Sequence, residues 1–209
     1  MRLAAAGLAL VCLCAAAGCA RPATLVRHPP PPEFGPRVAR ASQGAAVTPG
    51  RAAAGRTGDG WDVGGPQRAW QFIVIHHSAT STGSAARFDQ WHRSKGWDEL
   101  GYHFVIGNGT GSADGEVEVG SRWLSQKHGA HCKVAGHPEY NDVGIGICLV
   151  GDFNRSPPTE AQMASLARLV RWLMQRYHVP RGHIYGHGQL KSTDCPGRCF
   201  RYDDLFGRL

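Results

Sequence analysis

The run Trp70-Gln-Phe-Ile-Val-Ile-His-His77 is the stretch on which the fold prediction depends. It is a continuous apolar and β-branched segment, which is typical of a central strand covered by other layers on both faces. We expect the strand to stop at His76 and His77. In α/β proteins, active sites form where strands end and loops begin. The histidine pair is therefore a first candidate for chemistry.

The segments after this strand alternate between predicted helices and strands. Helices are predicted at 84–95 and 159–179, and strands at 101–106, 116–119, 143–150 and 184–185. Thr159 and Gln162 form a capping box at the start of the second helix, and Pro180 ends it. Because helices and strands interleave around one core, the sequence predicts an α/β fold.

The N-terminal residues predict export. A basic start and a short apolar run over 1–19 indicate a signal peptide, because the run is too short for a comfortable membrane span. Ala16-Ala17-Gly18-Cys19 is similar to a bacterial lipoprotein signal, which predicts lipidation of Cys19 and an outer-membrane protein facing the periplasm. The alternative is ordinary cleavage, which would give a periplasmic or secreted protein.

Residues 20–66 are rich in Pro, Ala, Gly and Arg and show no apolar periodicity. Such a segment cannot bury enough apolar surface to offset its ordering entropy, so we predict a disordered tether. Trp61 and Val63 are the residues in it that we expect to dock on the edge of the folded domain. That domain is predicted over residues 67–209.

The formal net charge is +7. A basic surface suits nucleic acid, an anionic membrane or an acidic polymer such as a bacterial cell wall, and an ordinary soluble surface explains the charge about as well. No helix-turn-helix, zinc-finger or stacking-platform motif is present, so the sequence does not support a nucleic-acid binder.

His187 and Cys195 lie on either side of a short polar loop and are both of a type that binds zinc. Catalytic zinc usually takes three protein ligands and keeps one position open for water, and His76 is the candidate for the third ligand. Taken singly, a lone histidine or a buried cysteine is more often structural. The prediction therefore depends on whether the fold brings the three together.

Several linked motifs resemble one family, the zinc-dependent N-acetylmuramoyl-L-alanine amidases shared by phage lysozyme-type amidases and peptidoglycan recognition proteins. The matching pieces, in family order, are Ile75 to Thr80, Trp91-His92 with Gly96-Trp97, Gly101 to Phe104, Gly129 to His131, Asn141 to Gly151, and Gly186-His187 with Thr193 to Gly197. The resemblance implies a single catalytic domain with a central mixed β-sheet flanked by helices, and Zn²⁺ in a surface groove.

The resemblance also implies roles for particular residues. The metal ligands fall on His76, His187 and Cys195, and the active-site positions on Tyr102 and Thr193. The reaction implied is zinc-assisted hydrolysis of the amide bond between N-acetylmuramic acid and L-alanine of peptidoglycan. His77 is expected on the opposite face of the strand from His76, because side chains alternate along a strand.

Another branch of the superfamily carries a glutamate, the candidate general base, at the position that Cys148 occupies in this chain. We interpret Cys148 as a small buried hydrophobe. This places the chain in the tyrosine-dependent branch.

Three further residues are candidates for the substrate groove. His131 is either a groove residue that touches substrate or a satisfied structural histidine. Asn141 is a possible groove residue, and so is Trp97, although a core position is the favoured interpretation for Trp97. If the protein is exported, Cys132 and Cys199 are candidates for a disulfide, which the sequence leaves open.

The predicted partner is peptidoglycan or a muropeptide, and the protein is expected to act as a monomer. The alternative function is a recognition module that binds peptidoglycan without cutting it.

Overall fold

The computed structural model describes residues 60–209. The predicted signal peptide, Cys19 and the tether up to residue 59 lie outside the described residues. Five strands form one sheet in the order β3-β2-β4-β1-β5. They are β1 (Phe72–His77), β2 (Phe104–Ile106), β3 (Val117–Val119), β4 (Gly144–Leu149) and β5 (Ile184–Gly186). The mixed sheet with flanking helices confirms the predicted fold class.

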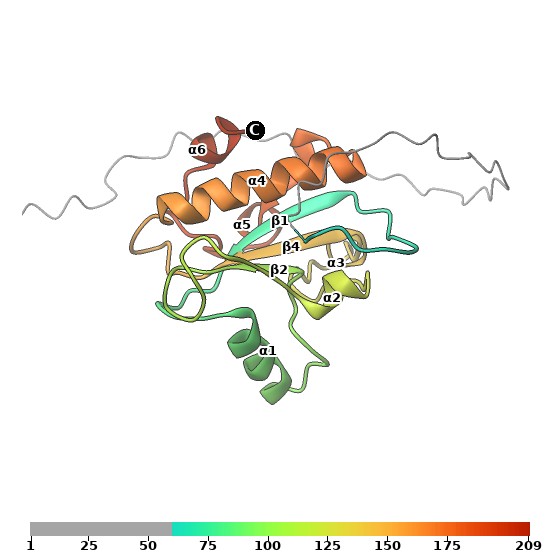
Figure 1. The fold of residues 1–209 in the computed structure, drawn as a ribbon, viewed down its shortest axis with the longest axis horizontal. Coiled ribbons are helices and arrows are strands. Elements are labelled where there is room, and N and C mark those ends of the chain that lie inside the picture. The colour runs from blue at the N-terminus through green and yellow to red at the C-terminus, as the bar shows by residue number, and fades with distance from the viewer. Residues whose placement is uncertain (1–59) are drawn as a thin grey trace, which may run out of the picture.

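Helices lie on both sides of the sheet (Figure 1). The α-helices are α1 (Ala85–Ser94), α2 (Ser121–Leu124), α3 (Glu139–Asp142), α4 (Glu160–Tyr177), α5 (His187–Leu190) and α6 (Tyr202–Phe206), and a 3₁₀ turn (Arg181–His183) precedes β5. In Figure 1, α4 and α6 lie above the sheet, and α1 and α2 lie below it.

Strand direction determines where the site forms. β1 pairs in parallel with both β4 and β5, β2 pairs in parallel with β4, and β3 alone is antiparallel to its neighbour β2. The carboxyl ends of four strands therefore meet at one edge. β1 ends at His77, as predicted, and both histidines are part of the strand. His76 pairs with Cys148 and His77 with Leu149 of β4.

The two faces of β1 pack against different layers. Ile73 and Ile75 belong to the larger core, which includes the buried stripe of α4, whereas Phe72 and Val74 belong to a smaller core on the other face. Because side chains alternate along the strand, His76 follows Val74 onto the face away from α4. His77 points the other way, and its Nδ1 accepts a hydrogen bond of 3.0 Å from the Phe153 backbone N–H.

The predicted capping box of α4 is confirmed. The Thr159 hydroxyl accepts a hydrogen bond from the Gln162 N–H at 3.0 Å, and Gln162 Oε1 accepts one from the Thr159 N–H at 3.2 Å. The buried Gln162 amide also donates to the Val150 carbonyl at 2.8 Å. The cap therefore anchors the helix to the chain that leaves β4.

Other predicted positions have mixed outcomes. Trp61 is 3% exposed and lies in the larger core, where its carbonyl accepts a hydrogen bond of 2.8 Å from Trp123 Nε1. The core interpretation of Trp97 was wrong, because its side chain is 41% exposed. Cys132 and Cys199 are both buried. None of the helices between residues 60 and 209 has the length and apolar character needed to cross a bilayer.

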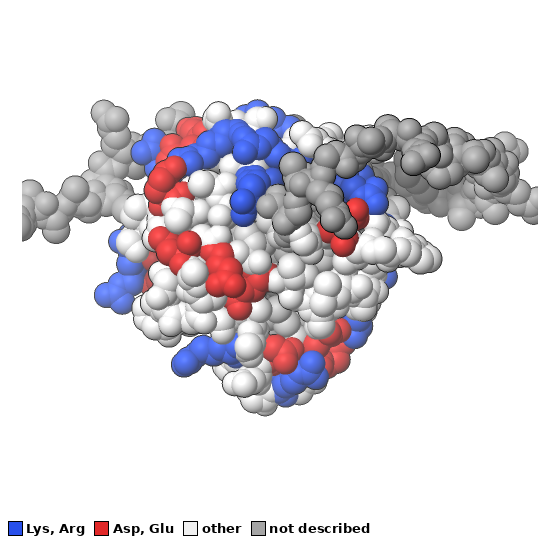
Figure 2. All heavy atoms as spheres, in the orientation of Figure 1, with Lys and Arg blue, Asp and Glu red and all other residues white. Residues whose placement is uncertain are grey.

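Figure 2 shows both signs of charge on the same face of the molecule. Lys and Arg gather mainly along the top, over α4 and α6, while Asp and Glu lie among and below them. The mixture on this face agrees with an ordinary soluble surface better than with a continuous basic stripe of the kind that follows a nucleic-acid backbone.

Candidate metal centre

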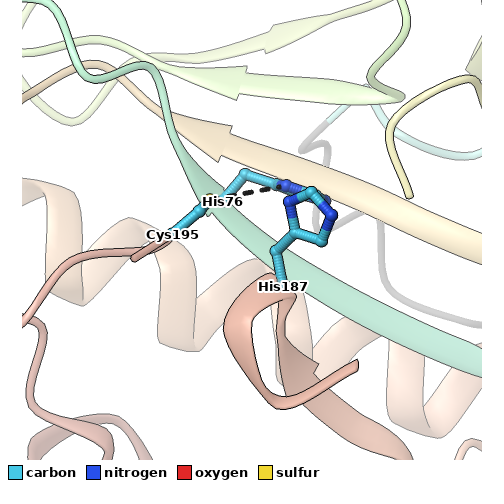
Figure 3. Close-up of side chains that lie close together, drawn as sticks. All are labelled: His76, His187 and Cys195. Atoms are coloured by element: carbon cyan, nitrogen blue, oxygen red, sulfur yellow. Dashed lines mark hydrogen bonds between the residues drawn. The ribbon is translucent and has the colours of Figure 1, made fainter. Parts of the chain in front are cut away.

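The structure brings His76, His187 and Cys195 together (Figure 3). Their potential ligand atoms all lie within 4.8 Å of one another. Nδ1 of His76 is 3.6 Å from Sγ of Cys195, and the rings of His76 and His187 have centroids 4.7 Å apart. Cys195 follows His76 by 119 residues in the sequence, yet the two are neighbours in the fold.

Strand register explains why the two histidines meet. Ile75 of β1 pairs with Gly186 of β5. The next residues, His76 in β1 and His187 at the start of α5, therefore lie side by side near the carboxyl edge of the sheet. His187 is also the first residue of α5, so its side chain is held at the junction of a strand and a helix.

Cys195 is held next to them by backbone contacts. The Gly188 N–H donates to the Cys195 carbonyl at 2.6 Å. A Cβ on Gly188 would overlap the Thr193 carbonyl, so only glycine allows the loop to pass this close to α5. The His77 N–H donates to Cys195 Sγ at 3.4 Å, which directs the sulfur toward the end of β1.

The donor set fits a zinc ion. Two imidazoles and one thiol are ligands that zinc prefers, and three protein ligands correspond to a site with an open position. Nε2 of His187 is buried and has no hydrogen-bond partner among residues 60–209, so it is available to a metal. A buried polar atom without a partner is costly, and a metal ion at this position would remove that cost.

Electrostatics keep the metal-free site uncharged. Burial, together with His131 and His187, lowers the pKa of His76 well below its usual value, and burial lowers the pKa of His187 to about 4. Burial raises the pKa of the Cys195 thiol to about 11, against the stabilising effect of the His77 N–H. Two neutral rings are ready to bind a metal, whereas the thiol has to lose its proton first.

Tyr102 lies close to the group. Its ring centroid is 5.3 Å from that of His76, and burial followed by the neighbouring Cys148 and Cys195 raises the pKa of its hydroxyl well above the usual value. The hydroxyl therefore stays protonated near neutral pH and can donate a hydrogen bond. Cys148 is fully buried in a third apolar cluster, against which Tyr102 packs, as its interpretation as a small hydrophobe implies.

Thr193 lies on the exposed side of the cysteine. Its hydroxyl accepts a hydrogen bond of 3.4 Å from the Cys195 N–H. A pocket of about 600 Å³ opens here, lined by Thr193 and Cys195 together with Arg155, Arg198 and Tyr202 among others. Space for a substrate therefore adjoins the cysteine and threonine, while His76 and His187 lie outside the lining of this pocket.

The possible groove residues take different positions. His131 is 8% exposed and lies against His76. Asn141 Oδ1 accepts hydrogen bonds from the N–H groups of His131 and Cys132, at 3.0 and 2.9 Å, so it holds that loop. The ring of Trp97 stacks on that of His92, with centroids 4.5 Å apart, and the centroid of the His92 ring is 5.7 Å from that of Tyr102.

Arg122 supports this region and was missed by the sequence analysis. Its side chain is 1% exposed, Nε donates to the Leu100 carbonyl at 2.6 Å, and Nη1 donates to the His128 carbonyl at 2.8 Å. One guanidinium thus joins the segment before Tyr102 to the segment before His131. These two partners are backbone carbonyls, so no sequence pattern indicates the contacts.

Comparison with known proteins places the site in context. The family model described as "N-acetylmuramoyl-L-alanine amidase" (Amidase_2) matches residues 66–198. The chain is 35% identical over 136 residues to peptidoglycan-recognition protein SC2 of Drosophila melanogaster, covering 60% of this chain and 67% of that protein. It is 35% identical over 139 residues to the endolysin of Enterobacteria phage T3, covering 63% and 83% respectively.

Among solved structures, the N-acetylmuramoyl-L-alanine amidase LysC from Clostridium intestinale superposes with a TM-score of 0.58 at 28% identity. The match covers 69% of this chain and 89% of that one.

Proposed function

The chain belongs to the N-acetylmuramoyl-L-alanine amidase family, and from that premise we propose that it is a zinc hydrolase acting on peptidoglycan. The bond cut is the amide between N-acetylmuramic acid and the L-alanine of the stem peptide. The observation that carries the proposal is the group His76, His187 and Cys195, whose ligand atoms lie within 4.8 Å of one another beside the ring of Tyr102.

In this proposal, His76, His187 and Cys195 hold the zinc. When bound, zinc supplies a Lewis acid that polarises the scissile carbonyl and acidifies water. Tyr102 binds and orients the substrate by donating a hydrogen bond to the carbonyl oxygen, because its raised pKa keeps the proton on the hydroxyl. The exposed Thr193 hydroxyl, at the edge of the pocket, is the second donor to that oxygen. One such donor contributes about 3 kcal/mol to transition-state stabilisation in comparable sites.

The complete ligand set favours catalysis over recognition alone. A module that only binds peptidoglycan has no need of three converging zinc donors. The relatives include one named as a recognition protein and one named as an endolysin. A digestion experiment separates the two functions.

Zinc-loaded protein is incubated with purified peptidoglycan, and the soluble products are analysed by mass spectrometry. We expect free stem peptides that begin with L-alanine, and none from a Cys195→Ser variant. Glycan fragments with intact stems would indicate a glycosidase instead. Binding to the sacculus without any released product would refute the proposed activity and establish a recognition module.

We also propose that the protein is exported and acts as a monomer, held by a lipid at Cys19 on the outer membrane and facing the periplasm. The motif that supports this lies outside the described residues. Labelled palmitate should be incorporated by wild-type cells and not after Cys19→Ala. Equal labelling of both would refute the anchor, and a periplasmic or secreted protein would remain.

A further inference from the structure

A chain of hydrogen bonds runs from the metal group into the sheet. Nε2 of His76 and Nδ1 of His131 are 3.1 Å apart, and Nε2 of His131 is 3.2 Å from the Gly144 carbonyl oxygen. A carbonyl can only accept, so His131 must carry its proton on Nε2.

The direction of the remaining bond follows from this. With its ring proton on Nε2, His131 presents the lone pair of Nδ1 to Nε2 of His76, 3.1 Å away, and Nε2–H of His76 donates to it. His76 then has its own lone pair on Nδ1, the atom that lies 3.6 Å from Cys195 Sγ. The tautomer of His76 that can bind a metal beside Cys195 is therefore the one that His131 stabilises.

The position of His131 is built into the surrounding chain. A Cβ on either Gly129 or Gly146 would overlap the imidazole ring, so both glycines leave space that the ring fills. The Asn141 side chain fixes the backbone by accepting from the His131 N–H at 3.0 Å. A ring so enclosed has little freedom to turn toward a substrate.

We propose that His131 is a positioning residue, which fixes His76 in the tautomer and orientation that present Nδ1 to the metal. This inference rests on the proposed metal site and adds a residue that acts through a ligand. Partners of this kind typically change metal affinity by 10- to 100-fold when they are lost. Without an acceptor at this point, His76 can also hold its proton on Nδ1, and that form cannot bind.

Two substitutions separate positioning from packing. In His131→Asn, Oδ1 takes the place of Nδ1 and remains an acceptor for His76, whereas His131→Leu fills space without accepting. We expect His131→Leu to weaken zinc binding by about 10- to 100-fold, and His131→Asn to stay within about threefold of wild type. A packing role alone would make the smaller asparagine at least as damaging as leucine.

His103→Leu is the matched control. His103 is also fully buried, but its nitrogens bond to backbone atoms, Nδ1 accepting from the Gly146 N–H and Nε2 contacting the Lys127 carbonyl. Its loss should lower stability and leave zinc affinity within about threefold of wild type.

The full-length chain is tested in two ways. In the metal-free protein, two-bond ¹⁵N–¹H correlation NMR of the histidine rings reports the tautomer, and competition with a chromophoric chelator gives the zinc dissociation constant. We expect the Nε2–H form of His76 in wild type and in His131→Asn, and the Nδ1–H form or a mixture in His131→Leu.

An Nδ1–H tautomer of His76 in metal-free wild type would overturn the inference, and so would unchanged zinc affinity in a folded His131→Leu. If His131→Leu does not fold, the wild-type spectrum and the asparagine variant still decide. A wild-type protein that binds no zinc would instead refute the proposed function, while its metal-free spectrum still tests the role of His131.

Discussion

Replacing Arg122 by leucine should lower the free energy of unfolding by about 3 kcal/mol. The guanidinium is the partner of two carbonyl groups, those of Leu100 and His128, and its Nη2 pairs with Asp98. Leaving the buried Leu100 carbonyl unpaired costs about 1 to 3 kcal/mol, the part-buried bond to the His128 carbonyl adds to this, and the apolar burial of leucine offsets part of the sum. Asp98 adds little, because its side chain is 51% exposed and stays solvated without Arg122.

Urea unfolding in the presence of a chelator measures this loss without the stabilising effect of bound metal. Arg208→Leu is the control, because that guanidinium pairs with the exposed Glu160 and its removal should leave the free energy of unfolding close to that of wild type. The release of stem peptides should also fall in Arg122→Leu, since the segments before Tyr102 and His131 lose their common anchor. If both arginine variants unfold within about 1 kcal/mol of each other, the reasoning about Arg122 is wrong.

Three further predictions concern the site and its support. Cys195→Ser should lose zinc and stem-peptide release together, and activity that survives in a verified metal-free sample would contradict the proposed mechanism. Tyr102→Phe should keep zinc affinity and lower kcat by about 100-fold or more, as expected for one lost donor of about 3 kcal/mol; unchanged kcat in the zinc-loaded variant would exclude that role. Lys127, followed by Arg122, lowers the pKa of Asp98 from 3.8 to about 2. The ionised Asp98 therefore stabilises the folded state above about pH 4, and this stabilisation is lost as the pH falls toward 2. Asp98→Asn should therefore flatten the acid dependence of unfolding in that interval, and identical slopes would show that Asp98 does not contribute.

Much of the fold could be predicted because the longest elements have clear local signals. The apolar runs of β1 and β4 and the capped stripe of α4 are each visible in the sequence. The helices α2, α3 and α5 were missed, because four residues are too few to show a helical period. Short helices depend on tertiary packing, which local sequence does not reveal.

The candidate site also has residues that the sequence could predict and contacts that it could not. His76, His187 and Cys195 could be chosen because their residue types bind zinc and their motifs resemble a family, and the structure places them together. The contact between His76 and His131 depends on how a loop folds against β4, where Gly146 leaves space for the ring. Trp97 shows the opposite case, since its size predicted burial while stacking on His92 leaves much of it exposed.

The spacing of the donors has a consequence for the order of events in the cell. His76 belongs to the first strand of the sheet, whereas Cys195 follows it by 119 residues. A chain whose synthesis stops before residue 195 lacks the complete donor set, even though it already contains every described strand and the capped helix. In the proposed function, metal loading would therefore be a late step that needs nearly the whole chain.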